Sequence, residues 1–271
     1  MTSTVKQFDT ASATDVGRVR AHNEDSISVD PDIGLATLAD GMGGYNAGEV
    51  ASGIAVAMVP TEIRKLTAAN ALIGLSDEAV QKIIGEQATK VNDAILNAAQ
   101  SQSQYSGMGT TLVIAYWHGN KVTIGHLGDS RCYRLRGDDI APLTKDHSWI
   151  QEQIDAGLMT IEQSRQSKKK NLITRACGID PNVQPEVHTY DVEAGDIYML
   201  ASDGLYDMVP AEEIHLTVMS LKSNLQLAAQ QLIQQANDNG GRDNISVILV
   251  HVLKVAQARK GFFAKLFGWF K

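Results

Sequence analysis

The sequence predicts a layered α+β domain in which helices cover a β-sandwich. Strand-like segments arrive in pairs joined by short glycine-containing turns, so we expect them to be antiparallel. Helix-like segments arrive in blocks, so we expect them to lie on a face of the sheets. No repeat is visible, and no linker divides the chain before about residue 253. We therefore expect one domain over residues 1–253 and a separate tail over residues 254–271.

The first half of the chain is predicted to hold one strand and two helices. Residues 33–40 (IGLATLAD) form a short apolar run that stops at Asp40, and a glycine-rich turn follows. A helix is expected from about Glu49 to Lys65. A second is expected over residues 77–99, where Ser76 or Asp77 can cap its start. Apolar residues recur at helical spacing in this second helix, which predicts one buried face.

The second half is predicted to consist mostly of strands, with one helix over residues 225–237 that ends before a glycine pair. The expected strands cover residues 110–117, 121–127, 131–136, 140–143, 183–190, 196–201 and 245–253. Residues 148–170 are polar and helix-prone and end in three lysines. This segment is either a solvated surface excursion or a small flap beside the active site that contacts the substrate.

Composition excludes several classes of protein. The 24 basic and 31 acidic side chains give a formal charge of −7, which argues against a general nucleic-acid binder. No uncharged apolar run is long enough for a spanning helix, and the first residues lack a secretory-signal pattern. Cys132 and Cys177 make no disulfide framework, and the seven histidines lack the spacing of zinc ligands. A cytoplasmic location is therefore expected.

Four aspartates stand where an apolar strand begins or ends, next to a small or polar residue: Asp40, Asp129, Asp203 and Asp243. A single aspartate in such a place is an ordinary turn-former. Strand ends in a layered sheet can gather at one edge, however, and would bring these carboxylates together. Their repulsion would be costly unless protons or cations neutralised it, and oxygen-only ligands suit Mg²⁺ or Mn²⁺. The pattern therefore favours a divalent metal site.

An upstream segment, residues 17–25, supplies the remaining groups for phosphate-ester hydrolysis. Glu24 and Asp25 add oxygen donors, and Arg20 offers a planar guanidinium for a phosphate. Two divalent ions can activate water and neutralise phosphate charge while an arginine orients the group. The chain has no nucleotide-binding GxxxxGK[ST] loop, no GxSxG elbow, no HExxH, and no cysteine in a CxxxxxR cradle.

These segments resemble, in the same order, those of the metal-dependent type 2C serine/threonine protein phosphatases, specifically their bacterial branch. The resemblance runs from residue 15 to about 252, through GRVRAHNED, LATLADGMGGYNAGEVAS, GMGTTLV, HLGDSRCYRLR, LTKDHS, LITRACG, LASDGLYDMV and GGRDNISVILV. It implies two central antiparallel sheets flanked by helix pairs, in α-β-β-α layers. It also implies hydrolysis of phosphoserine and phosphothreonine in proteins, with Mg²⁺ or Mn²⁺ as cofactor.

The resemblance assigns the metal ligands. Asp40 would bridge two catalytic ions, with the carbonyl of Gly41 on the second ion. Asp203 and Asp243 would hold the first ion. Asp129, together with Asp203, would hold a third, more weakly bound ion.

The same resemblance assigns supporting roles. Glu24 would support the second ion directly or through water, and Asp25 would stand behind the ligands. Asn244 would orient Asp243 or a bound water, and Arg20 would receive the substrate phosphate.

The implied mechanism is direct attack by a metal-bridged water on the phosphoryl group, without a phospho-enzyme. One departure concerns the proton donor to the leaving group. Animal members carry a histidine after the Asp-Gly pair, where this chain has Met42. His147 is one candidate donor, a water on the third ion is another, and His147 is alternatively a residue that braces its loop.

The tail from Lys254 is basic and aromatic. It holds four of the five phenylalanines, and Phe262, Phe263, Leu266, Phe267 and Phe270 would share one face of a helix. Such a segment can dock on an anionic membrane surface or in a partner's groove, or pack back on the domain.

Two other functions compete with an active phosphatase. A catalytically silent phosphoprotein-binding regulator on the same fold is the alternative, but silent relatives usually lose metal aspartates that this chain keeps. A two-metal nuclease fits poorly with the negative charge. The expected partners are phosphoproteins of a bacterial Ser/Thr kinase, and a monomer is the default.

Overall fold

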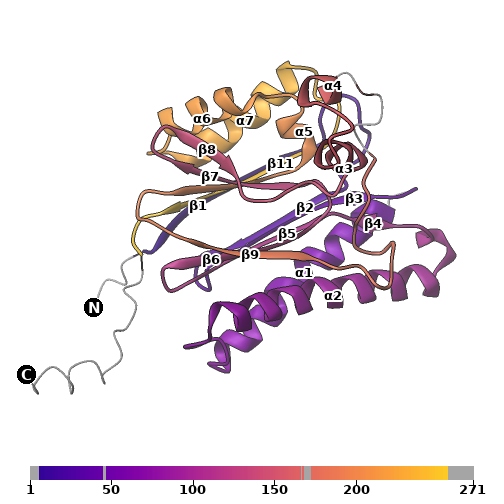
Figure 1. Ribbon diagram of the computed structural model, residues 1–271, viewed down its shortest axis with the longest axis horizontal. Coiled ribbons are helices and arrows are strands. Elements are labelled where there is room, and N and C mark those ends of the chain that lie inside the picture. The colour runs from indigo at the N-terminus through magenta and orange to yellow at the C-terminus, as the bar shows by residue number, and fades with distance from the viewer. Residues whose placement is uncertain (1–5, 45–46, 166, 168–171, 256–271) are drawn as a thin grey trace, which may run out of the picture.

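Two antiparallel sheets form the centre of the protein, which is described by a computed structural model over residues 6–44, 47–165, 167 and 172–255 (Figure 1). The first sheet has the order β1-β11-β10-β7-β8, formed by Phe8–Asp15, Ile245–Val252, Ile197–Ala201, Arg131–Arg136 and Asp139–Pro142. The second has the order β2-β3-β5-β6-β9, formed by Asp25–Asp30, Leu35–Met42, Leu112–His118, Lys121–Leu127 and Glu186–Asp191. A short strand β4, Gly109–Thr110, pairs with the end of β3.

Helices cover the outer face of each sheet. The pair α1 (Ala47–Ala68) and α2 (Asp77–Ser101) packs on the second sheet, at the bottom of Figure 1. The pair α6 (Ala211–Ser220) and α7 (Leu225–Asp238) packs on the first sheet, at the top. The layers are therefore α-β-β-α, as the resemblance implies.

Apolar side chains fill three layers of core, because the central strands are buried on both faces. Along β3, Leu35 and Ala39 face α1 and α2, while Ala36 and Leu38 face the space between the sheets. This alternation follows from the two-residue period of a strand. The core between the sheets therefore consists of every second residue of each central strand.

The predicted helices and hairpins are confirmed with small shifts at their ends. The side chain of Ser76 caps α2 by accepting a hydrogen bond from the backbone N–H of Ala79. The strand expected from residue 183 begins only at Glu186, because Pro185 has no N–H to donate to a ladder. The sequence analysis missed β1, β2, α6 and a short helix α5, Asp203–Tyr206.

The polar segment 148–170 holds two short helices, α3 (Trp149–Asp155) and α4 (Ile161–Arg165). Within the described ranges, no helix combines the length and the apolar character that crossing a bilayer requires. The amphipathic helix expected in the tail falls almost entirely on residues 256–271, which lie outside the described residues.

Candidate active site

The core between the sheets changes from apolar to polar at one end of the sandwich. On β3 the inter-sheet row runs Ala36, Leu38 and then Asp40. On β10 the row runs through Tyr198 and Leu200, and two residues further lies Ser202, just past the strand. By the same two-residue alternation the inter-sheet rows of β5, β7 and β11 reach a hydroxyl residue at this end: Thr111, Ser130 and Ser246.

These hydroxyl side chains hold the carboxylates at fixed positions. Asp25 lies directly opposite Asp40 in the β2–β3 ladder, and its Oδ2 accepts a hydrogen bond from Ser202 Oγ at 2.8 Å. The backbone N–H of Asp40 donates to Thr111 Oγ1 at 2.9 Å, and Thr111 Oγ1 lies 2.7 Å from Ser130 Oγ. The strand ends of both sheets are therefore connected by side-chain hydrogen bonds behind the carboxylates.

The structure brings the four predicted aspartates together, because, besides burial, the charges of the others in the group raise the pKa of Asp40, and those of Asp129 and Asp243 raise the pKa of Asp203. Burial, followed by the charges of Asp25 and Asp203, raises the pKa of Asp40 well above its usual range. Burial and the charges of Asp129 and Asp243 do the same to the pKa of Asp203. Burial and the charge of Asp146 raise the pKa of Asp129 to about 6. The site therefore favours protons or cations among its carboxylates.

Close contact of two backbones positions Glu24 and Gly41. A Cβ on Gly41 would lie 2.2 Å from the carbonyl oxygen of Gly48, in the first turn of α1, so only glycine fits there. The N–H of Gly41 donates to the carbonyl of Glu24 at 3.1 Å. The carboxylate of Glu24 accepts a hydrogen bond from the N–H of Gly48, while burial raises its pKa.

Asn244 connects the upstream loop to Asp243. Its Oδ1 accepts from the backbone N–H of Glu24 at 2.9 Å, and its Nδ2 donates to the carbonyls of Val16 and His22 at 3.0 and 2.8 Å. Its own backbone N–H donates to Asp243 Oδ1 at 2.8 Å. Asn244 is therefore placed to orient Asp243.

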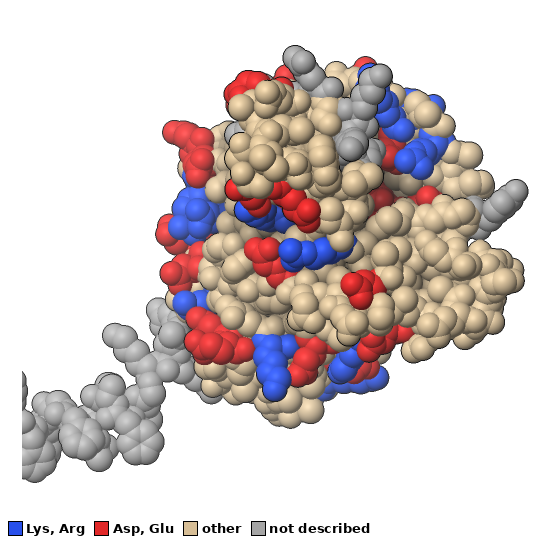
Figure 2. All heavy atoms as spheres, turned by 45° about the vertical axis from the view of Figure 1, so that its right-hand side comes forward, with Lys and Arg blue, Asp and Glu red and all other residues tan. Residues whose placement is uncertain are grey.

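Arg20 lies at the surface of the site. Its Nη2 donates to Asp243 Oδ2 at 2.7 Å, and its side chain is 48% exposed. The Arg20 side chain therefore remains accessible to an anionic ligand from the solvent side. Figure 2 shows acidic atoms in a hollow on this side of the molecule, with Lys and Arg side chains on its rim.

The donor set fits a hard divalent cation. Asp203 Oδ1 is buried and has no hydrogen-bond partner among the described residues. An unpartnered buried carboxylate oxygen is costly, and here it stands among other carboxylates. The side chains that meet at the site are oxygen donors, which Mg²⁺ and Mn²⁺ prefer.

Sequence reasoning missed the hydroxyl side chains behind the aspartates. The signal was present, since Thr111, Ser130, Ser202 and Ser246 all continue rows that are apolar further along the strand. His147, predicted as a proton donor or a loop brace, lies buried beside Gly128, one residue before Asp129.

Comparison with known proteins agrees with this geometry. The family model for protein phosphatase 2C matches residues 17–246. The chain is similar to a serine/threonine phosphatase, stp, from Listeria welshimeri, with 36% identity over 88% of this chain and 93% of the relative.

Solved structures extend the similarity to the fold. The structure of the Mycobacterium tuberculosis serine/threonine phosphatase PstP/Ppp has a TM-score of 0.80 and 33% identity, and the match covers 93% of this chain and 99% of that one. A structure of the PstP catalytic domain in complex with two manganese ions has a TM-score of 0.78 and 33% identity, over 91% and 99% of the two chains. The chain therefore belongs to the protein phosphatase 2C family and is a metal-dependent protein Ser/Thr phosphatase of the bacterial type.

Proposed function

We propose that this enzyme removes phosphoryl groups from phosphoserine and phosphothreonine of proteins modified by a bacterial Ser/Thr kinase. We further propose that water attacks the phosphorus directly, so that no covalent phospho-enzyme forms. The observation that carries the proposal is the group of buried carboxylates in which the charges of neighbours raise the pKa of Asp40 and Asp203, and in which Asp203 Oδ1 has no hydrogen-bond partner within the described part of the chain. Bound divalent cations would relieve the repulsion within such a group at neutral pH.

The proposed ligands are divided among two catalytic ions and a third, weaker one. Asp203, Asp243 and Asp40 would hold the first ion, and Asp40, the carbonyl of Gly41 and Glu24 would hold the second. Asp129 would hold the third ion together with Asp203. When bound, divalent ions lower the pKa of water and neutralise charge on phosphoryl oxygens. Mg²⁺ and Mn²⁺ both fit this oxygen-only donor set.

The protein's own groups then orient the substrate and the ligands. Arg20 binds the phosphoryl oxygens through the exposed part of its guanidinium, at a position already fixed by Asp243. Asp25 would stand behind the metal ligands, where its Oδ2 accepts a hydrogen bond from Ser202. Asn244 fixes the loop that carries Arg20 relative to Asp243, because it forms hydrogen bonds to both.

Further proposals concern the segments outside the carboxylate site and the location of the protein. Residues 148–170 act as a flap that contacts the phosphoprotein, the catalytic domain spans residues 1–253, and residues 254–271 dock on a membrane surface or a partner. A cytoplasmic location is supported by the free thiols of Cys132 and Cys177.

The test of direct attack uses matched peptides that carry phosphoserine, phosphothreonine or phosphotyrosine, in ¹⁸O-labelled water with Mn²⁺. We expect hydrolysis of the first two peptides, one ¹⁸O atom in each phosphate released, and no phosphoryl group retained on the protein. A trapped phospho-enzyme would overturn direct attack. Tight binding of the peptides without hydrolysis would favour the silent regulator instead.

A further inference from the structure

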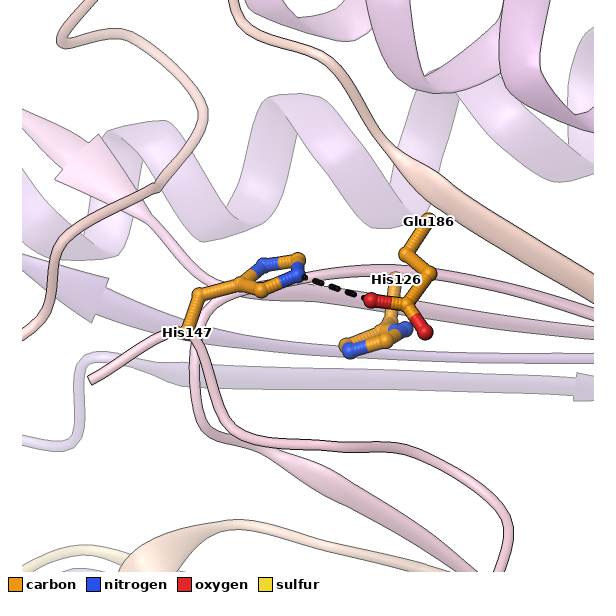
Figure 3. A group of neighbouring side chains, drawn as sticks. All are labelled: His126, His147 and Glu186. Atoms are coloured by element: carbon orange, nitrogen blue, oxygen red, sulfur yellow. Dashed lines mark ion pairs between the residues drawn. The ribbon is translucent and has the colours of Figure 1, made fainter. Parts of the chain in front are cut away.

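A buried histidine braces the turn that carries Asp129. His147 is 5% exposed, and its ring stacks on the ring of His126 with 4.6 Å between centroids. Glu186 approaches the same ring from β9, as Figure 3 shows. These three side chains lie outside the carboxylate group described above, although His147 is joined to it through one glycine.

His147 makes hydrogen bonds to both backbone polar groups of Gly128, and so to the peptide units on either side of this residue. The backbone N–H of His147 donates to the carbonyl of Gly128 at 2.9 Å. The N–H of Gly128 donates to His147 Nδ1 at 3.2 Å. A backbone bond alone would leave the orientation of Gly128 less restricted, so the side-chain bond adds a second fixed point.

The hydrogen bonds determine the tautomer of the ring. Burial, together with the neighbouring His126, lowers the pKa of His147 to about 4, so the ring is neutral at pH 7. A neutral imidazole has one N–H and one lone pair. Because Gly128 takes the lone pair of Nδ1, the proton is on Nε2, which faces Glu186 Oε2 at 3.5 Å. Arg175 Nη1, also 3.5 Å from Nε2, can only donate and finds no acceptor there.

The same bonds argue against a metal ion among the three residues, although their ligand atoms lie within 4.8 Å of one another. A histidine bound to a metal through Nε2 carries its proton on Nδ1. In this ring Nδ1 accepts a hydrogen bond from the N–H of Gly128, so that arrangement would place two N–H groups against each other. His126 Nε2 donates to the carbonyl of Lys145 at 2.8 Å, which fixes the proton of that ring on Nε2, so it is His147 that disfavours a metal ion. The group is a hydrogen-bond network.

Gly128 is a position that needs such a brace. Its φ of +97° is one that L side chains rarely adopt, and a Cβ there would lie 2.6 Å from Thr111 Cγ2. Glycine is therefore required, and glycine is also the residue type with the most backbone freedom. The direction of the next side chain, Asp129, depends on the backbone angles that Gly128 adopts. On the other side, Tyr206 Oη donates to the carbonyl of Asp129 at 2.9 Å.

We propose that His147 is a positioning residue for Asp129: its Nδ1 fixes the Gly128 peptide, and Glu186 keeps the proton on Nε2. The inference rests on the proposed role of Asp129 in the weaker metal site. It assigns His147 to the loop-bracing role and leaves the leaving-group proton to another donor. Both ring nitrogens are occupied by Gly128 and Glu186.

Two isosteric substitutions separate positioning from proton donation. In His147→Asn, Oδ1 takes the place of Nδ1 and can still accept from Gly128. In His147→Gln, the amide reaches the place of Nε2, and the acceptor for Gly128 is lost. The matched control is His215→Gln, because His215 lies on α6 and bonds the carbonyl of Gly137 in the β7–β8 turn.

The first readout is Mn²⁺ binding to the full-length protein by calorimetry, alongside protection of the Gly128 amide from hydrogen exchange by NMR. We expect His147→Gln to weaken the weakest Mn²⁺ site by about 10-fold or more and to lower Gly128 protection. His147→Asn should remain within about 3-fold of the wild type in Mn²⁺ affinity, the difference reflecting only the lost contact with Glu186. His215→Gln should match the wild type in both measurements.

The second readout compares a phosphothreonine peptide with p-nitrophenyl phosphate, whose leaving group needs no proton. Positioning predicts that His147→Gln lowers turnover of both substrates by the same factor, and that added Mn²⁺ restores part of it. The proposal would be overturned in favour of proton donation if both variants lost turnover of the phosphothreonine peptide equally while turnover of p-nitrophenyl phosphate stayed unchanged. Unchanged Gly128 protection in His147→Gln would also overturn it. Absence of the weak Mn²⁺ site in the wild type would refute the metal role of Asp129. The hydrogen-exchange measurement would still test whether His147 holds Gly128 in place.

Discussion

Replacing Asp129 by Asn should stabilise the metal-free protein while impairing its metal site. The pKa of Asp129 is raised from 3.8 to about 6, mainly by burial and then by the charge of Asp146. Ionising this carboxylate in the folded state therefore costs free energy. The shift is about 2 pKa units at ~1.4 kcal/mol each, or about 3 kcal/mol. Asn is isosteric and removes that cost.

The size of the effect depends on pH. A carboxyl with a raised folded-state pKa contributes stability below its unfolded pKa, near 3.9, and loses it as pH rises through about 6. The stability advantage of Asp129→Asn should therefore be near zero at pH 4 and reach about 3 kcal/mol above pH 6.5. With saturating Mn²⁺ the order should reverse, because only the wild type binds the weak ion fully.

Urea unfolding of EDTA-treated protein, followed by circular dichroism from pH 4 to 8, measures this difference. The matched control is Asp138→Asn, at the exposed β7–β8 turn, which should show no comparable dependence on pH. An advantage that stays flat across the pH range, or a variant less stable than the wild type at pH 7.5 without metal, would refute the reasoning.

Three further substitutions test the framework of the site. Gly41→Ala should destabilise the protein by about 2–3 kcal/mol in urea unfolding, since its methyl group would meet a backbone carbonyl at 2.2 Å. Gly53→Ala, in open space on α1, should instead be neutral or stabilising, and equal losses would contradict the argument. Thr111→Val should lower the free energy of unfolding by about 1–3 kcal/mol in the same assay, because it leaves the Asp40 N–H without its acceptor. An unchanged free energy of unfolding would contradict that role of Thr111. Arg20→Ala should lower kcat/KM for phosphopeptides about 10- to 100-fold while leaving Mn²⁺ affinity nearly unchanged, and a large change in Mn²⁺ affinity would show a different role.

The layered fold could be predicted because its strands carry strong local signals. Two apolar runs around Gly119 predict the β5–β6 hairpin, and apolar periodicity together with the Ser76 cap predicts α2. In contrast β1 reads as FDTASATD, a polar segment that becomes a strand only because β11 supplies eight paired residues beside it. Long-range pairing of that kind has no local sequence signal.

The candidate site could be predicted in its residues but not in its arrangement. Aspartates at strand ends, and the match to a known family, point to Asp40 and Asp203. The bond from Ser202 to Asp25 joins residues that are 177 positions apart, so only the folded structure shows it. The role of His147 was open in the sequence, because the choice between a proton donor and a brace depends on which atom each ring nitrogen faces.

The most direct test of the account is phosphate release from a phosphothreonine peptide, measured with Mn²⁺ and with excess EDTA, for the wild type and Asp203→Ala. Circular dichroism of both proteins would establish that the variant is folded. The account predicts release by the wild type that requires Mn²⁺ and disappears in Asp203→Ala, since Asp203 stands among the carboxylates that would hold the ions. Undiminished release in EDTA, or in the folded Asp203→Ala variant, would contradict the claim that these carboxylates hold the catalytic metal.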